Sequence, residues 1–111
     1  MKFQKLNQTL PYIKLNKFYK AALLSNQPAI DAILIASFCK KNNEVDARNV
    51  NLKIINDEQF IFFSNYNSPK STQFSSHDQI SAVLYWSTID VQIRMKAKIE
   101  KVTDKFSDEY F

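Results

Sequence analysis

The chain contains no glycine in 111 residues, and this absence limits both its turns and its functions. Glycine takes left-handed backbone angles more easily than any other residue, so turns must use Asn where such angles are needed. The segment Lys41-Asn42-Asn43 is a predicted turn of this kind. Phosphate-binding loops of the GxGxxG and GxxxxGK[ST] types need glycine at fixed positions, and both are therefore excluded.

Length and composition predict a single globular domain over residues 1–111. Apolar residues make up 45% and charged residues 23% of the chain, close to the averages for folded proteins. The longest apolar stretch, 32–39, is less than half of a membrane-spanning helix, and no apolar signal segment follows Met1. We therefore expect a cytoplasmic protein without membrane contact.

The charge and the single cysteine point to no special partner. The net charge is +4, but the lysines are scattered and the longest basic run is Lys40-Lys41, so no nucleic-acid partner is expected. Cys39 cannot form an internal disulfide and is expected to be a small buried residue. His77 has no cluster of metal-ligating residues nearby in sequence, so no metal site is predicted.

Hydrophobic patterning predicts a mainly β protein with flanking helices. A flexible arm is expected over residues 1–12, followed by an amphipathic helix between Lys14 and Leu24. Short helices are expected over 68–77 and from Thr103 onward. Five strands are expected over 30–39, 45–55, 60–64, 79–86 and 90–102. This order of elements predicts an antiparallel barrel with helices at its flanks.

The residue patterns of two of these strands also predict which of their faces are buried. Segment 30–39 is apolar on both parities, which is typical of a strand covered on both sides. Segment 90–102 alternates, with Val91 and Ile93 on one face and Gln92 and Arg94 on the other. The first face is expected to meet a core, and the second to meet solvent or a ligand.

Five motifs occur in a characteristic order and spacing. They are Arg48-Asn49-Val50-Asn51-Leu52-Lys53, the segment 62–70, Leu84-Tyr85-Trp86, Val91-Gln92-Ile93-Arg94 and Ser107-Asp108-Glu109-Tyr110-Phe111. In these motifs the chain resembles the N-terminal part of the pyridoxamine 5′-phosphate oxidase family, over nearly its whole length from about Leu15. The resemblance implies a split β-barrel of the FMN-binding type. It also implies a homodimer with FMN at the interface, which oxidises pyridoxine or pyridoxamine 5′-phosphate to pyridoxal 5′-phosphate with molecular oxygen.

The same resemblance implies roles for individual residues, none of them catalytic. The implied cofactor-binding residues are Arg48, Val50, Leu52, Lys53, Phe63, Ser64, Lys70 and Gln92. Arg48 and Lys70 face the FMN phosphate, and Gln92 hydrogen-bonds the flavin. The backbone of Val50 and Leu52 borders the isoalloxazine ring. Lys53 lies beside both flavin and substrate, and Tyr110 holds the substrate phosphate.

The residue pattern agrees with part of this assignment. Strand parity sends Arg48 and Lys53 to opposite faces, so the two cations are expected to serve different anions. Gln92 lies on the polar face of its strand, where it can reach a ligand. Lys70 falls in the first turn of the expected helix, where free backbone amides favour an anion.

Two departures from the family pattern leave alternatives open. Pro69 stands where the family commonly has an arginine, which removes one phosphate donor and is expected to lower the affinity for FMN. The sequence ends at Phe111, before the segments that complete the family's substrate pocket. A short oxidase and an FMN carrier or sensor without oxidase activity are both compatible with these features. A less favoured alternative is a small nucleic-acid-binding barrel that stacks bases on Phe60, Phe62 and Tyr66.

Overall fold

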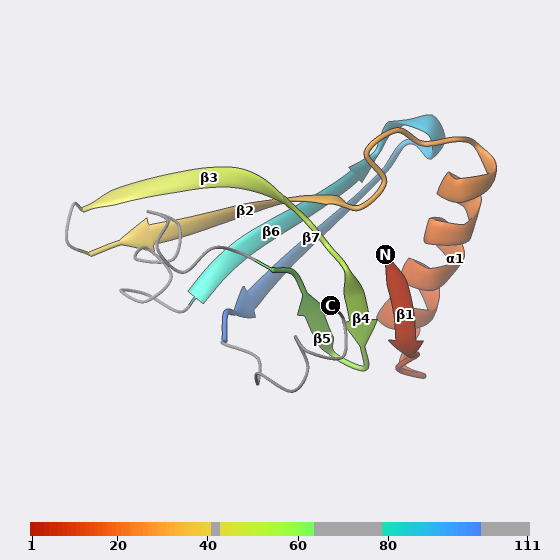
Figure 1. Cartoon of the computed structure of the whole chain (residues 1–111), viewed down its shortest axis with the longest axis horizontal. Coiled ribbons are helices and arrows are strands. Elements are labelled where there is room, and N and C mark those ends of the chain that lie inside the picture. Colours follow the sequence, from red (N-terminus) through yellow and green to blue (C-terminus); the bar gives the residue numbers. More distant parts are fainter. Residues whose placement is uncertain (41–42, 64–78, 101–111) are drawn as a thin grey trace.

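The described part of the fold consists of two β-sheets, an α-helix and a short 3₁₀ helix (Figure 1). The computed structural model describes residues 1–40, 43–63 and 79–100. The strands are β1 (Lys2–Lys5), β2 (Ala32–Cys39), β3 (Glu44–Asn51), β4 (Ile54–Asn56), β5 (Gln59–Ile61), β6 (Gln79–Trp86) and β7 (Val91–Lys98). The helices are α1 (Leu10–Leu24) and the 3₁₀ helix η1 (Ser87–Ile89). One sheet has the order β3-β2-β6-β7, and the other has the order β1-β4-β5.

This arrangement confirms the predicted mainly β architecture of the split-barrel type. The two sheets are not closed into a complete barrel. The helix expected at the N-terminal flank is α1, whereas the helices expected over 68–77 and after Thr103 lie outside the described residues. No helix in the described ranges is long and apolar enough to span a membrane.

The four-stranded sheet forms where apolar side chains alternate along the chain. The strand β6 has the predicted bounds, and every second residue in it is buried: Ile80, Ala82, Leu84 and Trp86. The strand β7 pairs with β6 over its whole length and ends at Lys98, before the predicted residue 102. The period-2 signal therefore identified both strands, and it overestimated only the length of the second.

The strand predicted over 45–55 is divided, because the chain changes sheets within it. The strand β3 ends at Asn51, and β4 begins at Ile54. Between them, the Leu52 amide donates to the Asp31 carbonyl (2.8 Å), and the Lys53 amide donates to the Ile61 carbonyl (2.8 Å). The backbone of Leu52 is thus hydrogen-bonded to the segment before β2, and the backbone of Lys53 is hydrogen-bonded to β5. The following β4–β5 hairpin turns at Asp57-Glu58, between the strands predicted over 45–55 and 60–64.

The first residues do not form the flexible arm that the sequence predicts. The strand β1 pairs in parallel with β4, from Lys2↔Ile54 onward, and the Lys2 amide donates to the Lys53 carbonyl (2.9 Å). The ring of Phe3 lies 5.2 Å from that of Tyr19. A four-residue strand whose partner lies far along the chain carries too little local pattern to be recognised.

The helix α1 begins earlier than predicted. Its first residue is Leu10, and Pro11 lies in the first turn. Proline is tolerated there because the amide it lacks has no partner within the helix. Pro11 falls within the arm predicted over residues 1–12, whereas in the structure this residue belongs to the helix.

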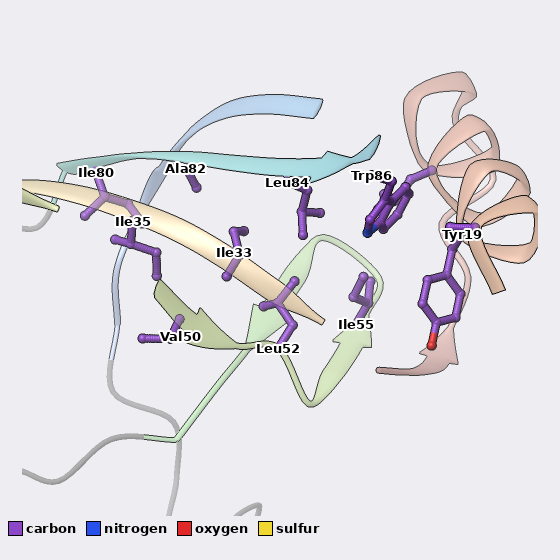
Figure 2. Packing of buried hydrophobic residues seen from close by; sticks show 12 residues of the cluster. Tyr19, Ile33, Ile35, Val50, Leu52, Ile55, Ile80, Ala82, Leu84 and Trp86 are labelled. Carbon is purple, nitrogen blue, oxygen red and sulfur yellow. The ribbon is translucent and has the colours of Figure 1, made fainter. Parts of the chain in front are cut away.

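The core lies between the inner face of the four-stranded sheet, the three-stranded sheet and α1 (Figure 2). Its buried residues include Tyr19 and Ala22 from the helix. Leu52 comes from the segment Leu52-Lys53 between β3 and β4, which we name the crossing segment, and Ile55 comes from β4. Trp86 is only 1% exposed, and its Nε1 donates to the Ile30 carbonyl (2.9 Å). Trp86 therefore belongs to the core, and the burial predicted for Cys39 is confirmed.

The opposite, outer face of the same sheet is uncovered in the described chain. On this face Leu34 is 40% exposed and Tyr85 is 55% exposed. The expectation that the 30–39 strand is covered on both sides is therefore wrong for a single chain. Apolar residues of both parities are present in β2, but only Ile33, Ile35 and their inner-face neighbours are buried.

Left-handed backbone angles occur without glycine, as the composition requires. Asn26, Asn43, Asp57 and Asp90 have φ values between 53° and 57°, and Asn and Asp tolerate this region better than most residues. Ala29 also has a positive φ, of 49°. An alanine in this conformation is strained by about 1–2 kcal/mol, because its Cβ crowds the backbone carbonyl.

We predict that Ala29→Gly stabilises the protein. Glycine relieves the strain but loses about 0.4–1 kcal/mol through the greater freedom of its unfolded chain, which leaves a gain of about 0.5–1 kcal/mol. Urea unfolding measures this change. The control is Ala36→Gly in β2, which has ordinary strand geometry and is expected to lose about 0.5–1 kcal/mol. Equal destabilisation by both substitutions contradicts the prediction.

Candidate functional site

The candidate site is centred on the segment that carries the chain from one sheet to the other. The Lys53 backbone is held on both sides, because its amide donates to Ile61 (2.8 Å) and its carbonyl accepts from Lys2 (2.9 Å). Leu52 is 1% exposed and anchors the segment in the core. The Lys53 side chain is partly exposed. The cationic side chain of Lys53 therefore extends from a backbone that two strands, β1 and β5, hold in place.

Phe63 belongs to the same neighbourhood. The bond between Lys53 and Ile61 places Lys53 beside the end of β5, from which the chain continues directly to Phe62 and Phe63. Phe63 is partly buried. Phe60 and Phe62 pack against the core, which does not favour the base-stacking surface considered for a nucleic-acid-binding barrel. Tyr66, the third residue of that surface, lies outside the described residues.

Arg48 already has an anionic partner on its own strand. Its guanidinium donates to the Asp46 carboxylate (2.7 Å), two residues away and on the same face of β3. The Ala47 amide donates to the other carboxylate oxygen (2.9 Å). The hydrogen bond from Arg48 is the main cause that lowers the pKa of Asp46 below its ordinary value of 3.8. A ligand anion at Arg48 must therefore compete with Asp46.

Val50 and Leu52 are buried, so only their backbone is available to a ligand. In an antiparallel ladder, alternate residues direct their amide and carbonyl toward the neighbouring strand. The Leu52 amide bonds to Asp31, and the same alternation directs the polar backbone groups of Val50 toward β2. The backbone groups at the free edge of β3, as far as the described chain goes, belong to Asn49 and Asn51. The family motif did not single out these two residues, although strand alternation at an edge identifies them.

Gln92 lies far from Arg48 within one chain. It is exposed on the outer face of β7, opposite Tyr85 of β6. Arg48 lies opposite Ile35 of β2, which is on the inner face. Because three strand spacings of about 4.8 Å separate β3 from β7, the two strands are about 14 Å apart. The structure therefore brings together Val50, Leu52, Lys53 and Phe63, with Arg48 two residues before Val50 on β3, but not Gln92.

Three of the predicted site residues, Ser64, Lys70 and Tyr110, lie outside the described residues, as does His77. Pro69 is also in this part of the chain. Among residues 1–40, 43–63 and 79–100, there is no group of three or more His, Cys, Asp or Glu side chains that could hold a metal ion.

The open pair of sheets defines a split barrel in which every strand pair except β1–β4 is antiparallel among the described residues, and solved structures share this fold. PhzG from Burkholderia lata 383, solved with tetrahydrophenazine-1-carboxylic acid, matches with a TM-score of 0.80 and 17% identity. The match covers 95% of this chain and 56% of that one. A pyridoxamine 5′-phosphate oxidase-related, FMN-binding protein from Nostoc punctiforme matches with a TM-score of 0.70 and 13% identity, over 93% and 55% of the two chains.

Comparison of the sequence with those of known proteins relates the chain to a more specific group than the fold does. The chain is 34% identical over 101 residues to pyridoxine/pyridoxamine 5′-phosphate oxidase from Nostoc sp., covering 91% of this chain and 47% of the relative. The enzyme of the same name from Burkholderia ambifaria is 30% identical with the same coverage. No model of a known protein family matches the chain. The predicted resemblance to the pyridoxamine 5′-phosphate oxidase family is confirmed, and the chain spans about half the length of these relatives.

We predict that the pKa of Asp46 rises toward its ordinary value of 3.8 in Arg48→Gln, because the substitution removes a hydrogen bond and a positive charge. A side-chain carboxyl NMR titration measures this pKa. The control Lys53→Gln removes a cation outside this pair and is expected to leave the Asp46 midpoint unchanged. An unchanged midpoint in Arg48→Gln indicates that the exposed ion pair does not persist in solution.

Proposed function

We propose that the chain is a cytoplasmic FMN-binding protein with pyridoxine/pyridoxamine 5′-phosphate oxidase activity. The observation that carries the proposal is the 34% identity to an enzyme of that name over 91% of the chain. The TM-score of 0.70 to an FMN-binding protein supports the same cofactor.

The available side chains fit the chemistry of FMN. The cofactor has a dianionic phosphate at one end and a flat ring with hydrogen-bonding edges at the other. Arg48 offers a partly exposed guanidinium, suited to a phosphate. Lys53 offers an ammonium group, which forms no ion pair within the described chain. Gln92 and the edge backbone of Asn49 and Asn51 offer the donors and acceptors that a flavin ring needs.

In this proposal the residues of the chain bind and orient, and the bound flavin supplies the hydride acceptor. Arg48 and Lys70 hold the cofactor phosphate. Phe63 and Ser64 border the flavin, and the buried Val50 and Leu52 fix the edge backbone of Asn49 and Asn51 that faces it. Lys53 lies between β3 and β4 and, with Tyr110, holds the phosphate of a B6 vitamer.

We also propose that the protein is a homodimer with FMN at the interface. Within one chain, Arg48 and Gln92 lie on opposite faces of the sheet and on opposite edges. A site that contains both is possible when Arg48 of one copy meets Gln92 of the partner subunit. The uncovered outer face with Leu34 and Tyr85 supports this arrangement, because a second copy removes these apolar side chains from water.

We predict that the purified full chain binds one FMN per chain, measured by quenching of flavin fluorescence. Arg48→Gln is expected to weaken binding at least tenfold, because a charge-assisted hydrogen bond contributes about 1.5–3 kcal/mol. Asp46→Asn is expected to strengthen binding, because it frees Arg48. Lys20→Gln in α1 removes the same charge elsewhere and is the control. An Arg48→Gln variant that binds FMN as tightly as the natural chain contradicts the assigned phosphate site.

The oxidase activity has its own test. The FMN-loaded chain, given pyridoxamine 5′-phosphate and oxygen, is expected to form pyridoxal 5′-phosphate faster than the same concentration of free FMN. Absorbance of the product measures the rate. Tight FMN binding without this turnover contradicts the oxidase and favours the carrier or sensor.

The dimer prediction rests on Leu34, which is 40% exposed near the centre of the outer face. We expect Leu34→Glu to weaken self-association at least a hundredfold, because it places an unpaired carboxylate in the apolar interface. Sedimentation velocity measures the oligomeric state. The control Leu24→Glu introduces the same charge at an 86% exposed site on α1 and is expected to leave the dimer intact. Equal dissociation in both variants, or a monomeric natural chain, contradicts an interface on this face.

A further inference from the structure

The positive charge of the protein is concentrated in its first thirty residues. Residues 1–30 contain five lysines and no Asp or Glu, whereas residues 31–111 contain ten cations and eleven anions. The lysines are scattered along the sequence, but the fold places β1 and α1 side by side at one end of the molecule (Figure 1). All five are exposed, and none forms an ion pair within the described ranges. The fold places two acidic residues beside the start of this segment, because the Met1 ammonium pairs with Asp31 and the Asn7 side chain donates to Asp57 (2.7 Å). The lysines of α1 therefore carry the unpaired positive charge of this region within the described chain.

The helix α1 also exposes large apolar side chains beside these lysines. Its core-facing residues are Leu15, Tyr19 and Ala22. Spacings of three and four residues define a second stripe that faces away from the core. This stripe, which we name the outer helix face, consists of Leu10, Ile13, Lys14, Lys17, Lys20 and Leu24. Leu10 is 62% exposed and Leu24 is 86% exposed, so they are among the most exposed apolar side chains of the described structure.

The chemistry of the outer helix face favours one kind of partner. A second copy of the chain is disfavoured, because it brings like charges together. A nucleic acid pairs with the lysines but makes no use of the protruding leucines. An anionic lipid surface satisfies both groups, because ammonium groups meet lipid phosphates while leucine side chains enter the boundary of the acyl region. A convex helix also suits a planar bilayer surface, which requires no matching groove.

We propose that the outer helix face binds the surface of anionic membranes, in contrast to the expectation from the sequence of no membrane contact. The interaction is peripheral, and α1 lies in the plane of the interface with its core face still packed on the protein. Lys14 and Lys20 flank the apolar residues, and their aliphatic stems extend the contact while the charged ends reach the headgroups. None of these residues belongs to the proposed flavin site, so this interaction does not depend on FMN.

Vesicle co-sedimentation of the full chain without added FMN tests the proposal. The first vesicles are phosphatidylcholine with about one third phosphatidylglycerol, and the second are phosphatidylcholine alone. We expect binding to the first and at least tenfold weaker binding to the second. Raising the salt from about 0.1 M to about 1 M is expected to weaken binding further, because it screens the lysines. Equal binding to both vesicles, or to neither, overturns the proposal.

Matched variants locate the contact. The triple variant Lys14→Gln, Lys17→Gln and Lys20→Gln is expected to reduce binding at least tenfold. The control triple variant Lys40→Gln, Lys96→Gln and Lys98→Gln removes the same charge from exposed positions elsewhere and is expected to change binding less than twofold. Equal losses in the two triple variants overturn the assignment to α1.

A second pair of substitutions distinguishes a lipid surface from a polyanion in general. Leu10→Ser with Leu24→Ser keeps every charge, and we expect it to weaken vesicle binding several-fold while the circular dichroism spectrum is unchanged. Single-stranded DNA is the competing probe. Binding to DNA that is tighter than to the anionic vesicles, together with no effect of the leucine substitutions, overturns the proposal in favour of a nucleic-acid surface.

Discussion

The two sheets depend on the backbone hydrogen bonds of Leu52 and Lys53. Leu52 is bound to the segment that leads into β2, and Lys53 is bound to both β5 and the start of β1. These bonds fix the point at which one long extended segment leaves the first sheet and enters the second. The buried Leu52 side chain prevents the junction from sliding, because any shift of one residue replaces it in the core with a polar neighbour.

The same junction determines how the candidate site is divided. Strand parity directs Arg48 toward the inner face, where Asp46 neutralises part of its charge, and it exposes the edge backbone of Asn49 and Asn51. Gln92 follows the opposite parity on the far edge of the sheet. The sheet therefore separates Arg48 and Gln92, which the resemblance to the family assigns to one ligand. The uncovered outer face supports a dimer in which Arg48 of one copy and Gln92 of the other contact the same ligand. In this proposal the alternation of side chains between the two faces of the four-stranded sheet is the reason that a complete site needs two copies of the chain.

The sequence predicted the parts of the structure that have a strong local pattern. The bounds of β6, the alternation of β7 and the core-facing stripe of α1 follow from residue spacing alone, because each buries one face. The strand β1 was missed, since its stability comes from a partner about fifty residues away. The division at Leu52 was also missed, because a strand that changes sheets remains apolar and extended on both sides of the change. For the site, the motif located the crossing segment, but the pairing of Arg48 with Asp46 and the edge role of Asn51 depend on register and on three-dimensional contacts.

The parallel pairing of β1 with β4 has a consequence for the order of events during synthesis. The strand β1 leaves the ribosome first, yet its hydrogen-bonding partner is made only after β2 and β3 have followed. Until then, Phe3 and the lysine-rich start of the chain have no sheet to join, although α1 can form through local contacts. The strand β1 is therefore made before the strand it pairs with, and it reaches its native place only after β4 is available.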